Sequence, residues 1–349
     1  MAENTIPAEV TEALRAAMSA VGITENEDLV ARILVTGVGL GMDDTDRLDL
    51  KISSAALTEM RAAFDLFAPY RDVLKVTIFG SARTKPDDPL YRQARDAARA
   101  LAGRGWMVVT GAGPGIMQAA AEGAGLHRSI GVSIRLPFEE KPNAAIADGQ
   151  NLVSMKYFFT RKLMLMKESH GFICVPGGFG TLDEMFELLT LQQTGKAEPM
   201  PIVLLDETGG TFWQGLRSFV DRHLVPAGVI NPDDFDRVLI TDSVSAAIDE
   251  ITGFWRNYDS LRWVRDHLVL RIRTPPTDAQ LDDLNDRFAH LLTAGRIERT
   301  EPLRDERQDH DRLDLPRLVM QLSPYRVGGL FHLVAAINAL ADPPADPAA

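Results

Sequence analysis

The hydrophobic pattern along the chain changes twice, and each change marks a region of different predicted architecture. Before residue 70, apolar positions recur at helical spacing, which predicts helices over about 7–21, 26–38 and 53–67. From 71 to 258, short apolar runs alternate with helical stretches. After 259, strand-like runs surround a capped helix at 277–292. We therefore expect a helical N-terminal extension (1–70), a central domain (71–258), a small α+β domain (259–341) and a flexible tail (342–349).

The central region has the pattern of a parallel sheet with helices on both faces. Near-continuous apolar strands separated by helices are typical of that architecture. The sequence thus predicts a doubly wound (Rossmann-like) α/β sheet, with the helical preface and a small C-terminal α+β appendage. The expected strands are 73–79, 106–110, 130–136, 171–175, 201–205 and 237–240.

One segment of the C-terminal region consists mostly of charged residues. Between 304 and 314, eight positions are Arg, Asp or Glu. A run of this kind predicts a solvated loop.

Composition narrows the possible functions. The 349 residues include 37 Lys and Arg against 49 Asp and Glu, a net charge of −12. This surplus argues against binding nucleic acid or anionic membranes, both of which attract clustered cations. The single cysteine, Cys174, forms no intrachain disulfide, and the seven histidines have no metal-ligand spacing, so no metal is expected. Without a secretory signal or an apolar run long enough to span a bilayer, a cytoplasmic protein is expected.

Three predicted strands end in glycine-rich turns, at 80–81, 111–115 and 176–181. Strands of an open α/β sheet deliver their carboxyl ends to one edge, where ligands bind. One such turn needs no ligand, because glycine closes tight turns. Three of them favour a phosphate site, since amides at a helix N-terminus attract anions. The candidate binding residues are Gly80, Ser81, Gly113, Gly177, Gly178, Gly180 and Thr181.

The spacing of these glycines argues against the commonest phosphate ligands. The turn at 111–115 reads G-A-G-P-G, which is not the dinucleotide G-x-G-x-x-G, and no P-loop occurs. A mononucleotide or a sugar phosphate fits better.

Glu184 has two interpretations. Thr181 and Glu184 have the spacing of a capping box, in which the glutamate would only bond back to the helix start. Beside the glycines, however, the same carboxylate would lie close to a bound phosphate. It would then act on another part of the ligand, such as a ribose or a positive charge developing on it.

Arg161 also has two interpretations. The stretch 157–166 is apolar nearly all round, and Arg161 projects between Phe158 and Leu165. A buried guanidinium needs a partner, which is either a structural carboxylate or a ligand phosphate or Glu184 across the cleft. The neighbouring Lys162 either extends outward or adds a second cation.

Together these segments resemble the Lonely Guy (LOG) family, also labelled "lysine decarboxylase-like", over roughly residues 72–256. The matching strings are Phe79-Gly80-Ser81-Ala82-Arg83, Gly111-Ala112-Gly113-Pro114-Gly115-Ile116-Met117, Phe159-Thr160-Arg161-Lys162 and Pro176-Gly177-Gly178-Phe179-Gly180-Thr181-Leu182-Asp183-Glu184. A decarboxylase would need pyridoxal phosphate and a Schiff-base lysine, and no spacing singles one out.

The resemblance implies a phosphoribohydrolase, which cleaves the N-glycosidic bond of a nucleoside 5′-monophosphate, AMP-like or a cytokinin nucleotide, to free base and ribose 5-phosphate. By motif, Arg161 and Glu184 match the catalytic pair. A glutamate after the third strand, Glu139 or Glu140, is a further expected ligand contact. No cofactor is implied, and a homodimer or a higher even homo-oligomer is expected. The matched nucleotide contacts are Lys162, Gly178, Gly180, Thr181 and Thr190.

Glycosidic cleavage passes through an oxocarbenium-like state, which a carboxylate at Glu184 would stabilise. The alternative is a non-catalytic nucleotide or molybdenum-cofactor carrier on the same fold, or an enzyme acting on another phosphoribosyl compound. The presence of both Arg161 and Glu184 favours the hydrolase. The family's compact members lack the N- and C-terminal extensions, whose role the sequence leaves open.

Overall fold

The computed structural model describes residues 6–135, 143–147 and 151–341. The chain divides into two compact units, 1–62 and 63–349, which we describe separately. Within the described ranges, no helix is long and apolar enough to cross a membrane.

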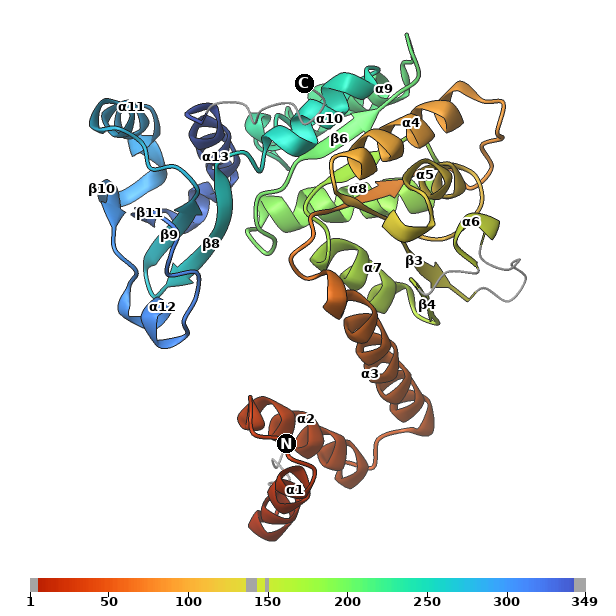
Figure 1. Cartoon of the computed structure of the whole chain (residues 1–349), viewed down its shortest axis with the longest axis vertical. Coiled ribbons are helices and arrows are strands. Elements are labelled where there is room, and N and C mark those ends of the chain that lie inside the picture. The colour runs from red at the N-terminus through yellow and green to blue at the C-terminus, as the bar shows by residue number, and fades with distance from the viewer. Residues whose placement is uncertain (1–5, 136–142, 148–150, 342–349) are drawn as a thin grey trace. The chain divides into compact units, whose positions relative to one another are not determined.

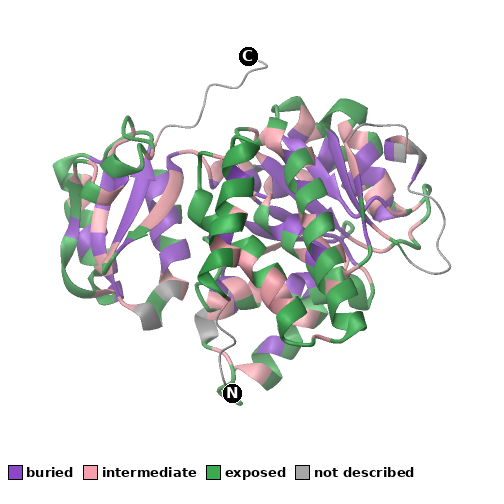
Figure 2. Ribbon diagram, turned by 90° about the horizontal axis from the view of Figure 1, so that it is seen from below, coloured by how far each residue is buried: buried purple, intermediate pink, exposed green. Residues whose placement is uncertain are grey.

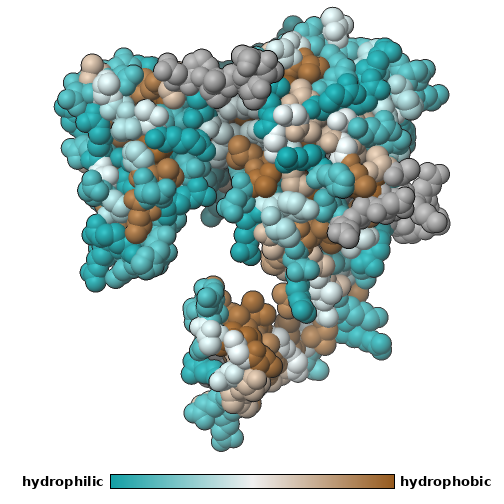
Figure 3. All heavy atoms as spheres, viewed as in Figure 1, coloured by the Kyte–Doolittle hydropathy of each residue, from teal (hydrophilic) through white to brown (hydrophobic). Residues whose placement is uncertain are grey.

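The N-terminal unit is helical, as the pattern predicts. It contains α1 (Ala8–Ala20), α2 (Glu27–Met42) and the first part of α3 (Arg47–Phe67). Helix α2 ends four residues later than expected and runs through the glycines at 37, 39 and 41. Few of its side chains are buried, and Figure 3 shows apolar surface over α2, where Leu29 and Ile33 are exposed.

The larger unit is built on a seven-stranded, wholly parallel sheet in the order β4-β3-β2-β1-β5-β6-β7 (Figure 1). This confirms the doubly wound prediction, with β1 and β5 adjacent where the winding direction reverses. The strands are β1 (Lys75–Phe79), β2 (Met107–Thr110), β3 (Ser129–Ile134), β4 (Leu152–Met155), β5 (Phe172–Cys174), β6 (Ile202–Leu205) and β7 (Val238–Thr241).

Strand β4 was not predicted. It is four residues long and lies at the sheet edge, where Leu152 is half-buried and Ser154 exposed. A short, alternating edge strand lacks the continuous apolar run that identifies the central strands.

Alternate side chains of the strands pack against opposite layers of helices. Val76 and Ile78 of β1 face α4, α5 and α10 in one buried cluster. Thr77, between them, donates to the Leu165 carbonyl of α7, so α7 covers the other face. Figure 2 shows the buried residues concentrated in the strands. The helices are α4 (Pro89–Gly103), α5 (Ile116–Ala124), α6 (Ala144–Ala147), α7 (Phe158–Lys167), α8 (Phe179–Gln193), α9 (Phe212–Phe219) and α10 (Val244–Gly253).

The C-terminal region forms a second, antiparallel sheet in the order β10-β11-β9-β8. One face packs on helices α11 and α13 through an apolar core. Thr277 and Gln280 form a capping box at the start of α11. Strand β8, which contains charged residues at half-exposed positions, was not predicted. The elements are β8 (Tyr258–Val264), β9 (His267–Ile272), α11 (Asp278–Phe288), β10 (Leu292–Thr300), α12 (Arg304–Gln308), β11 (Arg317–Leu322) and α13 (Leu330–Ala339).

The last helix is tied to the start of this second sheet. Asn338 Oδ1 accepts the amides of Asn257 and Tyr258, at 2.9 and 2.8 Å. Its side-chain amide donates to the Phe254 carbonyl. The Tyr258 hydroxyl in turn donates to Glu198, in the segment that follows α8, at 3.3 Å.

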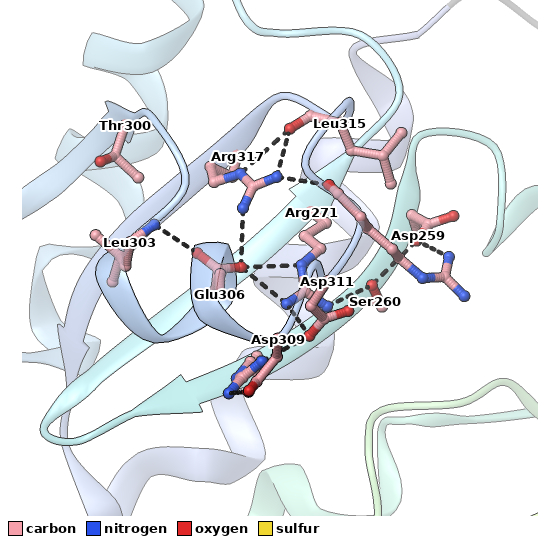
Figure 4. Close-up of polar contacts among 12 residues, drawn as sticks. Asp259, Ser260, Arg271, Thr300, Leu303, Glu306, Asp309, Asp311, Leu315 and Arg317 are labelled. Carbon is pink, nitrogen blue, oxygen red and sulfur yellow. Dashed lines mark hydrogen bonds and ion pairs between the residues drawn. The ribbon is translucent and has the colours of Figure 1, made fainter. Parts of the chain in front are cut away.

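The prediction of a solvated loop at 304–314 is wrong for residues 304–308, whereas 309–314 form a mostly exposed turn. Residues 304–308 form α12, and Glu306 is fully buried between two arginines of the sheet (Figure 4). Its Oε1 lies 2.8 Å from Arg271 Nη2 and 2.9 Å from Arg317 Nη1. Burial alone would raise the pKa of Glu306, but the Leu303 amide and both arginines hold it below its ordinary value. The arginines come from other segments, so the charge pattern of 304–314 does not reveal them.

We expect the Glu306→Ala variant to lose about 3–5 kcal/mol of unfolding free energy, because it leaves two buried guanidinium groups without their shared carboxylate. Urea unfolding followed by circular dichroism measures the loss. The matched control is Asp282→Ala, which breaks an exposed ion pair with Arg296 and should cost less than about 1 kcal/mol. Equal losses in the two variants would contradict the assignment of Glu306 as the anchor of α12.

Candidate functional site

The structure brings the three predicted glycine turns together at the carboxyl edge of the sheet. The Ser81 amide donates to the Pro176 carbonyl at 3.3 Å, which joins the turns after β1 and β5. The Ser81 carbonyl accepts the Ile116 amide at 3.0 Å, which adds the turn after β2. Residues far apart in sequence thus form one continuous edge.

Two glycines are required by these close approaches. A Cβ on Gly177 would lie 2.3 Å from Thr181 Oγ1 and 3.0 Å from the Ser81 amide nitrogen. Gly115 has φ +68°, and a Cβ there would lie 2.3 Å from the Ser81 carbonyl oxygen. Gly80 is equally confined, since its Cβ would meet Ile116 at 2.5 Å. By contrast, nothing lies within 4 Å of a Cβ on Gly178 or Gly180.

The capping-box interpretation of Thr181 and Glu184 is wrong. Helix α8 is capped by Gly178 and begins at Phe179, so Thr181 is already inside it. Glu184 lies a turn further on and is too far from the N-cap for the reciprocal bond. The exposed first-turn residues 178–180 therefore leave helix amides available to an anion.

Glu184 is buried in a charged environment, and one of its oxygens has no hydrogen-bond partner among the described residues. It is 7% exposed, and no described residue bonds its Oε2. Burial raises the pKa of Glu184 to about 7, against the opposing charges of Lys162 and Arg161. The protein thus holds a carboxyl group that changes protonation near neutral pH, as general acids and bases do.

Arg161 spans the ends of two strands. Its Nε donates to the Val132 carbonyl of β3 at 2.9 Å, and its Nη2 to the Gly111 carbonyl after β2 at 3.3 Å. A Cβ on Gly111 would lie 1.9 Å from this Nη2, so the glycine makes room for the guanidinium. The positive charge lowers the pKa of Glu184, which places the predicted pair within electrostatic range.

Lys162 faces inward to α8. Its Nζ lies 2.8 Å from Asp183 Oδ2 and also bonds Glu187, with 14% of the side chain exposed. Burial lowers the pKa of Lys162, but these carboxylates raise it above its ordinary value overall. The lysine therefore joins α7 to α8 on either side of Glu184.

The remaining predicted residues are less directly placed. Ser81 and Gly113 are half-buried in their turns. Thr190 is exposed and donates to the Phe186 carbonyl of its own helix at 2.8 Å, about 9 Å beyond Glu184 along α8. The structure does not bring Thr190 to the sheet edge. Glu139 and Glu140 lie outside the described residues.

One residue at the edge was missed. Asn143, 7% exposed, donates its side-chain amide to the Gly113 carbonyl at 2.8 Å and its backbone amide to Ala112 at 3.0 Å. No motif or periodicity marks it, because its role depends on a turn 30 residues earlier. Among the described residues, no three His, Cys, Asp or Glu side chains group to hold a metal ion.

Several known proteins have sequences similar to this chain. The model of a family described as "possible lysine decarboxylase" matches residues 115–251. The chain is 31% identical over 163 residues to a cytokinin riboside 5′-monophosphate phosphoribohydrolase of Mycobacterium tuberculosis, covering 46% of this chain and 83% of the relative. The protein of the same name from Mycobacterium marinum is 29% identical over 169 residues, covering 48% and 87%. The chain belongs to this family, the LOG family.

Solved structures match this chain at lower similarity. The molybdenum cofactor binding protein of Rippkaea orientalis is 21% identical, with a TM-score of 0.36, and covers 52% of this chain and 95% of its own. DNA processing protein A of Helicobacter pylori is 19% identical, also with a TM-score of 0.36, and covers 50% and 79%. Likenesses at this level carry no conclusion about function.

We expect Glu184→Gln to stabilise the protein at alkaline pH. The folded-state pKa lies above the ordinary value of 4.5, so the wild type loses stability as pH rises from 4.5 through 7. The variant should be more stable by up to about 3 kcal/mol at pH 8 and by under about 1 kcal/mol at pH 5. Urea unfolding at both pH values checks this, with the exposed Glu298→Gln as the control. A gain independent of pH would contradict the raised pKa.

Proposed function

We propose that residues 71–258 form a catalytic domain that hydrolyses the N-glycosidic bond of a nucleoside 5′-monophosphate to free base and ribose 5-phosphate. The observation that carries the proposal is Glu184, a buried carboxylate with one oxygen unbonded among the described residues. It lies about one and a half turns from a helix start that suits a phosphate. The names of the relatives support the same reaction. The substrate class includes AMP-like and cytokinin nucleotides.

The phosphate would be held by backbone groups. The first-turn amides of α8 have no partners within the helix, and Gly177, Ser81 and Thr181 are packed tightly beside them. A single phosphate held by amides is compatible with the net charge of −12, because this site needs no cluster of cations. Fixing the phosphate sets the position of the ribose attached to it.

Glu184 would act on that ribose. Water adds across the bond between C1′ and the base nitrogen: the C1′–N bond breaks, a C1′–O bond forms, and one proton passes from water to the base. Positive charge develops on the ribose in the transition state. The carboxylate form of Glu184 stabilises this charge or orients the water. With a pKa of about 7, a large share of the group is ionised at neutral pH.

Arg161 and Lys162 would keep Glu184 reactive. Without their charges, burial would raise the pKa of Glu184 further and leave it protonated. Arg161 also remains close enough to the glycine turns to attract the substrate phosphate. No step in this scheme needs a cofactor.

We expect ribose 5-phosphate release from at least one member of a panel of AMP, GMP, IMP, CMP, UMP and isopentenyladenosine 5′-monophosphate. Glu184→Gln and Arg161→Ala should each lower kcat at least about a hundredfold, since both groups act in the transition state. Activity should rise with pH as Glu184 ionises. Thr190→Ala, on the same helix but away from the edge, is the control and should retain turnover.

Tight binding of a nucleotide or of the molybdenum cofactor without release of ribose 5-phosphate would replace the hydrolase with a carrier. Turnover of other phosphoribosyl compounds alone would keep the chemistry and change the substrate. Wild-type turnover in Glu184→Gln would remove the catalytic assignment.

We also propose that the enzyme works as a homodimer or a higher even homo-oligomer through the outer face of α7 and α8. Five apolar side chains are exposed there, and apolar surface is visible over α7 in Figure 3. Phe179 is 93% exposed at the start of α8. The partner at this face would be a second copy of the chain, because an even oligomer provides one. In an isologous contact, this face packs against the same face of the other copy. The five are Phe158, Phe159, Leu163, Phe179 and Phe186.

Size-exclusion chromatography with light scattering should give an even multiple of the 38.4 kDa chain. Phe159→Glu should shift the mass toward one chain, because it puts a charge into an apolar contact. Phe219→Glu, at a similarly exposed phenylalanine on α9, is the control and should not. A monomeric wild type, or an unchanged mass for Phe159→Glu, would remove this face as the interface.

A further inference from the structure

Three successive carbonyls of the turn after β2 are held by side chains or amides from other parts of the unit. Gly111 O accepts Arg161 Nη2, Ala112 O accepts the Asn143 amide, and Gly113 O accepts Asn143 Nδ2. The distances are 3.3, 3.0 and 2.8 Å respectively. Asn143 therefore holds the carbonyls of Ala112 and Gly113, which directly follow the Gly111 carbonyl that accepts Arg161.

The turn needs such support because its backbone is unusual. Ala112 is buried and has φ +58°, the left-handed region that residues with a Cβ occupy at a cost of roughly 1–2 kcal/mol. Its amide is held by Thr110 Oγ1 at 3.1 Å. The Ala112 amide lies in the same peptide plane as the Gly111 carbonyl, so this bond sets the direction of that carbonyl. The Asn143 bonds hold the next two carbonyls, of Ala112 and Gly113, and so fix the rest of the turn.

We propose that Asn143 is a positioning residue that acts through Arg161. By fixing the turn it aims the Gly111 carbonyl at the guanidinium, and so holds Arg161 in place relative to Glu184. The inference rests on the proposed function only for its kinetic consequences, since the geometric claim about Arg161 is independent of the reaction.

The chemistry of the Asn143 side chain indicates that it serves as a hydrogen-bond donor and not only to fill space. The residue is 7% exposed, and its buried Oδ1 has no hydrogen-bond partner in the part of the chain that the structure describes. An unsatisfied buried acceptor costs about 1–3 kcal/mol, which an apolar side chain of similar size would avoid. The asparagine is therefore explained by the bond that its side-chain amide donates to Gly113, because the backbone bond to Ala112 needs no particular side chain.

A double-mutant cycle of Asn143→Ala and Arg161→Ala tests the proposal. We expect Asn143→Ala to lower kcat about tenfold with a smaller change in KM. In the Arg161→Ala background it should change kcat less than twofold, because the group it positions is absent. Asn143→Asp keeps the volume but loses the donor, and should fall at least as far as the alanine variant. Multiplicative losses in the double variant, or wild-type kcat in Asn143→Asp, would overturn the proposal.

A second measurement needs neither substrate nor activity. Phenylglyoxal modifies accessible arginines, and mass spectrometry follows Arg161 on its own peptide. Its rate should rise several-fold in Asn143→Ala and in Gly111→Ala, where the new Cβ displaces the guanidinium. Asn285→Ala is the matched control: Asn285 is also 7% exposed and donates to carbonyls, but in the second sheet.

An unchanged Arg161 rate in Asn143→Ala, or an equal rise in Asn285→Ala, would overturn the positioning role. If the wild type releases no ribose 5-phosphate from any nucleotide, the proposed function fails alone, and the phenylglyoxal rates decide the positioning role without it.

Discussion

The adjacency of β1 and β5 is the constraint on which the site depends. The chain winds outward from β1 through β2, β3 and β4, and then returns to place β5 on the other side of β1. Right-handed crossovers send the helices of the two halves to opposite faces, so their turns diverge and leave an opening between them. The Ser81–Pro176 bond closes the base of this opening, and the start of α8 forms one wall. Close contact at that base excludes side chains, which accounts for Gly177 and Gly115.

Two buried glutamates show how surroundings decide what a carboxylate does. Glu306 forms ion pairs with two arginines and accepts a hydrogen bond from a backbone amide. It therefore stays ionised and holds α12 in place. Glu184 feels the charges of Lys162 and Arg161, and one of its oxygens has no hydrogen bond to any described residue. The first arrangement stabilises the fold. The second lowers the stability and leaves Glu184 able to exchange a proton near neutral pH. Stability lost at a site of this kind is expected where function requires reactive groups.

The central strands and the glycine turns were predictable because each is encoded locally, by an apolar run followed by G-S, G-A-G-P-G or P-G-G-F-G-T. The position of Arg161 on an apolar helix also indicated a special role. What the sequence did not reveal depends on partners from distant segments. Asn143 acts on a turn 30 residues away, and Glu306 is buried by arginines of β9 and β11. Lys162 was ambiguous for the same reason, since its carboxylate partners lie on α8. Strand β4 escaped prediction because an edge position relaxes the demand for apolar residues.

Asn338 joins the two ends of the C-terminal sheet region. Its oxygen accepts the amides of residues 257 and 258, so the entry of the chain into this sheet and the end of its last helix meet at one point. The β8–β11 sheet and its apolar core thus begin and end at one place on the larger unit. Because the Tyr258–Glu198 bond starts from the same place, the sheet is attached to the segment after α8 at the point where it begins and ends.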